Sequence, residues 1–105
     1  MSKWTKFRLI IHCMDSQERI REILGEPLPD EIEEEQYDNA IANCHLPKGS
    51  EGSLHYAIFK AGSANIIVII GSLRDYLPEQ GRVWYKETMP KLKYATSEVV
   101  IIEEG

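Results

Sequence analysis

Five consecutive β-branched residues, Ile66 to Ile70 (IIVII), constrain the fold of this chain more than any other segment. β-branched side chains pack well on a pleated sheet, and a continuous apolar run is typical of a strand that is buried on both faces. We therefore expect a central strand within Asn65 to Leu73. The chain must then supply other strands to pair with it.

Alternating apolar residues predict these other strands. The alternation is clear over Lys6 to Cys13 and again over Ser53 to Ala61. The segment Glu98 to Glu104 (EVVIIEE) has an apolar middle, which predicts a last strand in an interior position. Ala40 to Leu46 is a weaker candidate for a short strand.

Helical signals interrupt the strands at two places. Asp15 and Glu18 stand in capping-box spacing, and Gly25 is a suitable residue to end the helix that they begin. For the segment between Arg74 and Ser97, a helix that begins at Pro78 is favoured over a strand. The apolar stripe of the first helix consists of Ile20, Ile23 and Leu24.

This order of elements predicts an α+β fold in a single globular domain that spans residues 1–105. We expect a mainly antiparallel sheet of about five strands, with two helices on one face. The arrangement approximates a ferredoxin-like fold with an acidic insert.

Charge is distributed unevenly along the chain. The net charge is −5, but residues 15–38 contain ten acidic and two basic residues, so this segment carries −8 and the remainder +3. A negative field repels nucleic acids and anionic membranes, and it attracts basic partners. We therefore expect no direct nucleic-acid binding and no membrane association. The longest apolar run is far shorter than a membrane span, and no export signal is recognisable, so a cytoplasmic location is expected.

The acidic segment Asp30 to Asp38 (DEIEEEQYD) holds six carboxylates in nine residues. A helix and a loop are both compatible with it. It is either a solvated segment that aids solubility or a docking surface whose self-repulsion a cationic partner would offset. An aromatic residue within such a segment is typical of a binding hot spot. The predicted partner-binding residues are Asp30, Glu31, Glu33, Glu34, Glu35, Tyr37 and Asp38.

Two pairs, His12-Cys13 and Cys44-His45, contain the residue types of a zinc site. Adjacent residues of a strand point to opposite sides of the sheet, however, and the usual gap of two to four residues between ligands is missing. We therefore expect reduced core cysteines, no metal and no cofactor.

The chain contains no glycine-rich phosphate-binding loop and no hydrolase motif, so we do not expect an enzyme. Immunity proteins and phage-encoded inhibitors of host defences are commonly small, acidic and free of catalytic motifs. By class and charge, we predict an inhibitor that occludes a basic functional surface of another protein, such as the nucleic-acid-binding cleft of a nuclease. The alternative is a small enzyme or metabolite-binding protein with a site formed by His12, His55 and Cys44. A homo-oligomer is left open.

Overall fold

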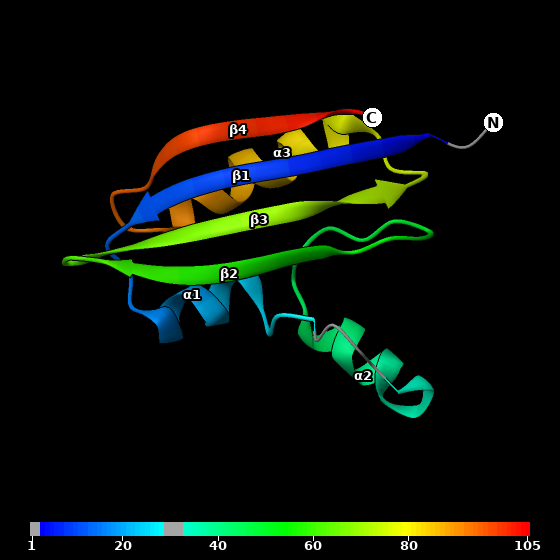
Figure 1. The fold of residues 1–105 in the computed structure, drawn as a ribbon, viewed down its shortest axis with the longest axis horizontal. Coiled ribbons are helices and arrows are strands. Elements are labelled where there is room, and N and C mark those ends of the chain that lie inside the picture. Colours follow the sequence, from blue (N-terminus) through cyan, green and yellow to red (C-terminus); the bar gives the residue numbers. More distant parts are fainter. Residues whose placement is uncertain (1–2, 29–32) are drawn as a thin grey trace.

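The computed structural model describes residues 3–28 and 33–105. Four antiparallel strands form one sheet in the order β2-β3-β1-β4 (Figure 1). The strands are β1 (Trp4–Cys13), β2 (Leu54–Ala61), β3 (Ala64–Arg74) and β4 (Thr96–Glu104). The helices are α1 (Gln17–Leu24), α2 (Glu34–Asn43) and α3 (Pro78–Thr88), and a 3-10 turn, Met89–Lys91, follows α3.

The expected α+β class is confirmed, with differences in the count of elements. Within the described residues the sheet has four strands instead of about five, and there are three helices instead of two. With α2 set aside, the order of elements is β-α-β-β-α-β, as in ferredoxin-like domains. Helix α2 therefore occupies the place of the predicted acidic insert.

Two predictions about strands are wrong. Among the described residues β4 pairs only with β1, so it is an edge strand and not an interior one. The segment Ala40 to Leu46 is not a strand, because α2 continues to Asn43 and only Cys44 forms an isolated bridge. The apolar residues of β4 lie on both sides of the strand, with Ile102 buried toward the helices and Ile101 on the other side, and this pattern did not distinguish an edge strand from a central one.

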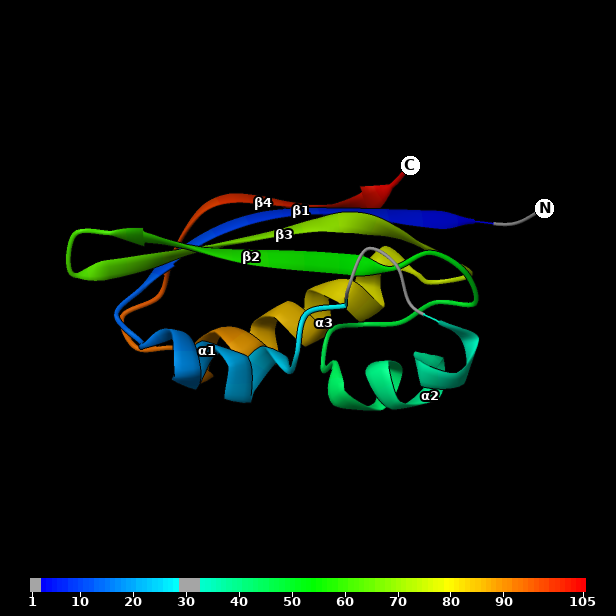
Figure 2. The ribbon, with the colours of Figure 1, turned by 60° about the horizontal axis from the view of Figure 1, so that its bottom comes forward.

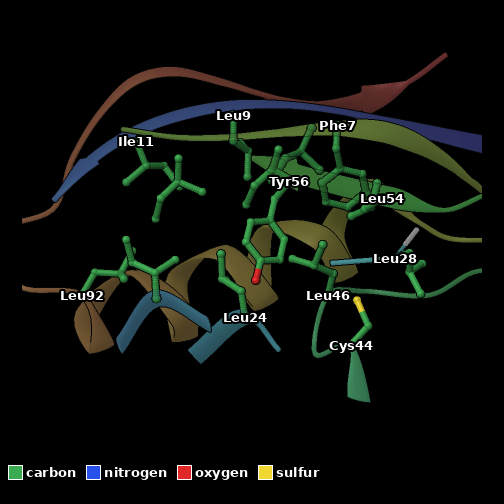
Figure 3. Packing of buried hydrophobic residues seen from close by; sticks show 14 of the residues in the cluster. Phe7, Leu9, Ile11, Leu24, Leu28, Cys44, Leu46, Leu54, Tyr56 and Leu92 are labelled. Carbon is green, nitrogen blue, oxygen red and sulfur yellow. The ribbon is translucent and has the colours of Figure 1, made fainter. Parts of the chain in front are cut away.

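The helices lie together on one side of the sheet (Figure 2). The two-residue period of the strands turns one set of side chains toward them. Leu9, Ile67 and Ile69 are fully buried there, and they pack with Ile20 and Leu24 of α1 in one core cluster. Figure 3 shows this layer, in which Phe7, Leu9, Ile11, Leu54 and Tyr56 point from the sheet toward the helices.

The central strand β3 is buried on one face only, which corrects the expectation from the IIVII run. Ile67 and Ile69 are inaccessible, whereas the side chain of Ile70 is 50% exposed. No helix of the described residues covers this second side of the sheet, which we call the open face (Figure 2). By strand register the residues in the middle of this face are Lys6, Arg8, Ile10, His12, His55, Ala57, Phe59, Ile66, Val68, Ile70, Thr96, Val99, Ile101 and Glu103, and Glu98 joins them at a bulge of β4, where its carboxylate meets His12.

Both predicted helices are present. In α1 the N-cap is Ser16, one residue later than expected, and its hydroxyl accepts a hydrogen bond from the Arg19 amide at 3.1 Å. Asp15 instead accepts a hydrogen bond from the Lys93 amide and so ties the start of α1 to the segment before β4. Gly25 ends α1 with φ of 80°, a conformation that favours glycine. Helix α3 begins at Pro78, as predicted.

Candidate functional site

Helix α2 lies outside the framework that the other elements form. It belongs to no sheet, and none of its residues is fully buried. In Figure 1 it projects beyond the outline of the sheet, next to the start of β2. Residues 33–38 of the predicted binding segment therefore form the beginning of a helix on the surface. Asp30 and Glu31 lie outside the described residues.

A short backbone bridge fixes the end of α2 to the body. The Glu26 amide donates to the Asn43 carbonyl at 2.8 Å, and the His45 amide donates to the Leu24 carbonyl at 2.9 Å. Cys44 sits in this bridge with only 1% of its surface exposed. Because isolated helices of about ten residues are marginal in water, this anchor makes an important contribution to the order of α2.

The two sides of α2 differ in chemistry. Tyr37, Ala40 and Ile41 recur at helical spacing, and the latter two pack partly against the core. At 100° per residue, the carboxylates of Glu34, Asp38 and Glu35 fall within one sector of about 100°, and Glu34 is the one of the three nearest to Tyr37. They are all exposed. The neutral residues Gln36, Asn39 and Asn43 occupy the adjoining sector, where Asn39 lies one turn after Glu35.

The carboxylates of this helix differ from several others of the chain in having no ion-pair partner among the described residues. Among the described residues, Glu33, Glu34, Glu35 and Asp38 form no salt bridge, whereas six acidic residues elsewhere do. The helix dipole favours acidic residues in the first turn, which gives a structural reason for the three glutamates. It gives none for Asp38, which lies past that turn and one turn from Glu34, where like charges repel.

Tyr37 lines a cleft between α2 and the segment before β2. The cleft has a volume of about 120 Å³, and its apolar walls include Leu28, Ile41 and Leu46. Ligand pockets usually measure about 300–1,000 Å³, so this one suits a single side chain better than a metabolite. The side chain of Tyr37 is 52% exposed, and it remains accessible to a binding partner.

The sequence predicted a binding role for Tyr37, and it gave no indication of the residues that line the cleft with it. Leu28 and Leu46 are far from Tyr37 in the sequence, and no local pattern connects them. Ile41 could have been found, because it follows Tyr37 by one helical turn.

The cysteines are buried and free. Desolvation raises the pKa of the Cys13 thiol, which is the opposite of what a nucleophilic cysteine needs. The site proposed for His12, His55 and Cys44 does not form. Both histidines lie on the open face, on strands that β3 separates, whereas Cys44 is buried on the helical side.

His12 has a different partner, since its Nε2 atom lies 2.9 Å from a carboxylate oxygen of Glu98. Over residues 3–28 and 33–105, no three His, Cys, Asp or Glu side chains lie close enough together to hold a metal ion. No helix in these ranges is long and apolar enough to cross a membrane.

Comparison with protein-family models, with curated proteins and with solved structures finds no match to this chain. The surface of α2 and its chemistry are therefore the features that indicate a function.

Proposed function

We propose that this protein binds a basic surface of another protein through the acidic side of α2, and that it inhibits that protein by covering the surface. This is the mode of action of small immunity-type and anti-defence inhibitors. One observation carries the proposal: the carboxylates of Glu34, Glu35 and Asp38 share one side of an anchored helix and have no cation partner among the described residues.

The framework of the fold supports this interpretation. The four strands, α1 and α3 form a complete sheet-and-helix unit, to which α2 contributes only the partly buried Ala40 and Ile41. The repulsion between Glu34 and Asp38 costs about 0.2–0.5 kcal/mol. Neither carboxylate forms a salt bridge with a described residue that would offset this cost. A cationic partner would remove that repulsion on binding.

The geometry also suits rapid and specific association. Exposed carboxylates steer a basic partner before contact, and Tyr37 beside them offers a half-buried aromatic anchor. Because the bridge at Cys44 already orders the end of the helix, less conformational entropy is lost on binding. The partner class is a protein whose lysines and arginines normally contact an anion such as a phosphate backbone.

The experiment is a capture from lysate of the source organism with three baits: the parent protein, Glu34→Gln/Asp38→Asn on α2, and Glu79→Gln/Glu87→Gln at exposed positions of α3. Both variants raise the net charge by the same amount, but only the first changes the acidic side of α2. We expect the parent and the second variant to retain the same basic protein at low salt and to release it as salt rises. The first variant should lose it.

Equal capture by all three baits would contradict the proposal, and so would a captured protein that is insensitive to salt. A helical circular dichroism signal that is the same for the three baits is the control for folding.

A further inference from the structure

The open face carries an apolar band that crosses all four strands. In the middle row of the strand register, Ala57, Val68, Ile10 and Val99 lie side by side on β2, β3, β1 and β4. Ile70 and Phe59 on either side of this row are 50% and 55% exposed. A band of this kind on an uncovered sheet indicates an interaction surface.

The two rows that flank the middle row on the open face carry complementary charges. One row reads His55, Ile70, Arg8 and Ile101 from β2 to β4, and the other reads Phe59, Ile66, His12 and Thr96. Glu98 is next to His12 because its carboxylate binds the histidine ring. The first row thus has its cation on β1, where the second row has a His–Glu pair.

We propose that two copies of this chain pack face to face through their open faces. A two-fold axis along the middle row reverses the strand direction and keeps the order of the strands. Ile70 then lies over Ile66 of the second copy, and His55 lies over its Phe59. Arg8 lies over the His12–Glu98 pair of the second copy, and the contact occurs twice.

Two two-fold axes would bring the open faces together, one along the middle row and one along the strands. The charge on Arg8 favours the axis along the middle row. Arg8 is exposed between Ile70 and Ile101, and it forms no salt bridge with any described residue. A two-fold axis along the strands would place it over Ile70 of the second copy, where a buried charge without a partner is costly. With the axis along the middle row it meets Glu98, whose side chain is 64% exposed and available.

The size of the face predicts a weak dimer. Four strands about 4.8 Å apart and eight residues of about 3.3 Å each give a flat area of about 500 Å². Two such faces bury about 1,000 Å² or somewhat more, which is near the lower limit of specific interfaces. We therefore expect micromolar dissociation. Helix α2 lies on the other side of the sheet and stays accessible in the dimer (Figure 2).

Sedimentation velocity over about two decades of concentration around 10 µM tests the proposal. The parent should change from monomer to dimer within this range. Val68→Asp, in the centre of the open face, should remain monomeric. Val83→Asp is the matched control, because Val83 is 54% exposed on α3, away from the open face, and this variant should dimerise like the parent.

A charge exchange tests the arrangement itself. Arg8→Glu alone and Glu98→Arg alone should each weaken the dimer at least tenfold, and the double variant should recover most of the loss. A parent that is monomeric throughout would overturn the proposal. A dimer that tolerates Val68→Asp, or a double variant no tighter than the single ones, would overturn it too. None of these results depends on the function of α2.

Discussion

The hydroxyl of Tyr56 donates a hydrogen bond to the backbone carbonyl of Gly25 and so joins the middle of β2 to the end of α1. Tyr56 is buried, and its ring lies in the layer between the sheet and the helices (Figure 3). The same stretch of chain, through Glu26, holds the end of α2. This hydrogen bond therefore connects the sheet to the segment that supports the acidic helix.

Tyr56→Phe should lower the free energy of unfolding by about 1–2 kcal/mol, because it leaves the Gly25 carbonyl buried without its donor. Urea unfolding followed by circular dichroism measures the change. Tyr94→Phe is the control, since Tyr94 is 79% exposed and its hydroxyl is free to bond with water. If the two substitutions change the free energy of unfolding equally, the hydrogen bond from Tyr56 to Gly25 contributes no more to stability than an exposed hydroxyl does.

Stability should also depend on pH through Tyr56. Burial raises the pKa of this phenol from 10 to about 12 in the folded state. Because the folded pKa is the higher one, the contribution of the neutral phenol is complete below pH 10 and is lost as the pH rises toward 12. The difference in unfolding free energy between the parent and Tyr56→Phe should therefore shrink between pH 10 and 12. A constant difference would contradict this.

Gly81→Ala should destabilise the protein by about 1–3 kcal/mol, although alanine is the better helix former. Gly81 is buried where α3 meets the sheet, and an added Cβ would lie 2.6 Å from Cζ of Phe7 and 2.8 Å from Cγ2 of Ile102. Val83→Ala, at an exposed position of the same helix, should change stability little. Denaturant midpoints of the two variants are the measurement.

Asp38→Asn should leave the stability unchanged or raise it by about 0.3 kcal/mol, because it removes the repulsion with Glu34. Glu22→Gln offers the opposite case, since Glu22 accepts a salt bridge from Arg19 at 2.9 Å. Its loss should cost about 0.3 kcal/mol. Thermal unfolding of both variants in parallel shows the sign. A clear loss of stability in Asp38→Asn would mean that this carboxylate serves the fold.

Tyr37→Ala should weaken partner binding at least tenfold, as expected for an aromatic hot spot. The cost in folding should stay below about 1 kcal/mol, because half of the ring is already in water. Tyr94→Ala removes a more exposed tyrosine from another part of the surface and should leave binding intact. Titration calorimetry with the captured partner, together with unfolding of the free variants, separates the two effects.

Local patterns were enough to predict β1, α1 and β3. Phe7, Leu9 and Ile11 alternate without interruption, and the cap and the stop of α1 are close together in the sequence. The edge position of β4 could not be predicted, because Val99 and Ile101 belong to the open face. Alternation cannot distinguish a face that a helix covers from one that it does not.

The structure of α2 was more predictable than the sequence reasoning allowed. Tyr37, Ala40, Ile41 and Cys44 recur at helical spacing, but the pattern is weak because alanine contributes so little to it. The exposure of the carboxylates follows from their charge. The cleft beside Tyr37 does not follow from any local signal, because Leu46 reaches it only through the fold.

The bridge between Gly25 and Cys44 has a consequence for how this chain can diversify. It closes the framework at the two points where the acidic segment leaves and re-enters, and Ala40 and Ile41 are the residues of α2 that pack against the core. Residues 33–43 can then be regarded as a segment whose sequence is replaceable while the rest of the fold stays the same. A replacement sequence need only keep apolar residues at positions 40 and 41 and span the same gap, so that the same fold binds a different partner.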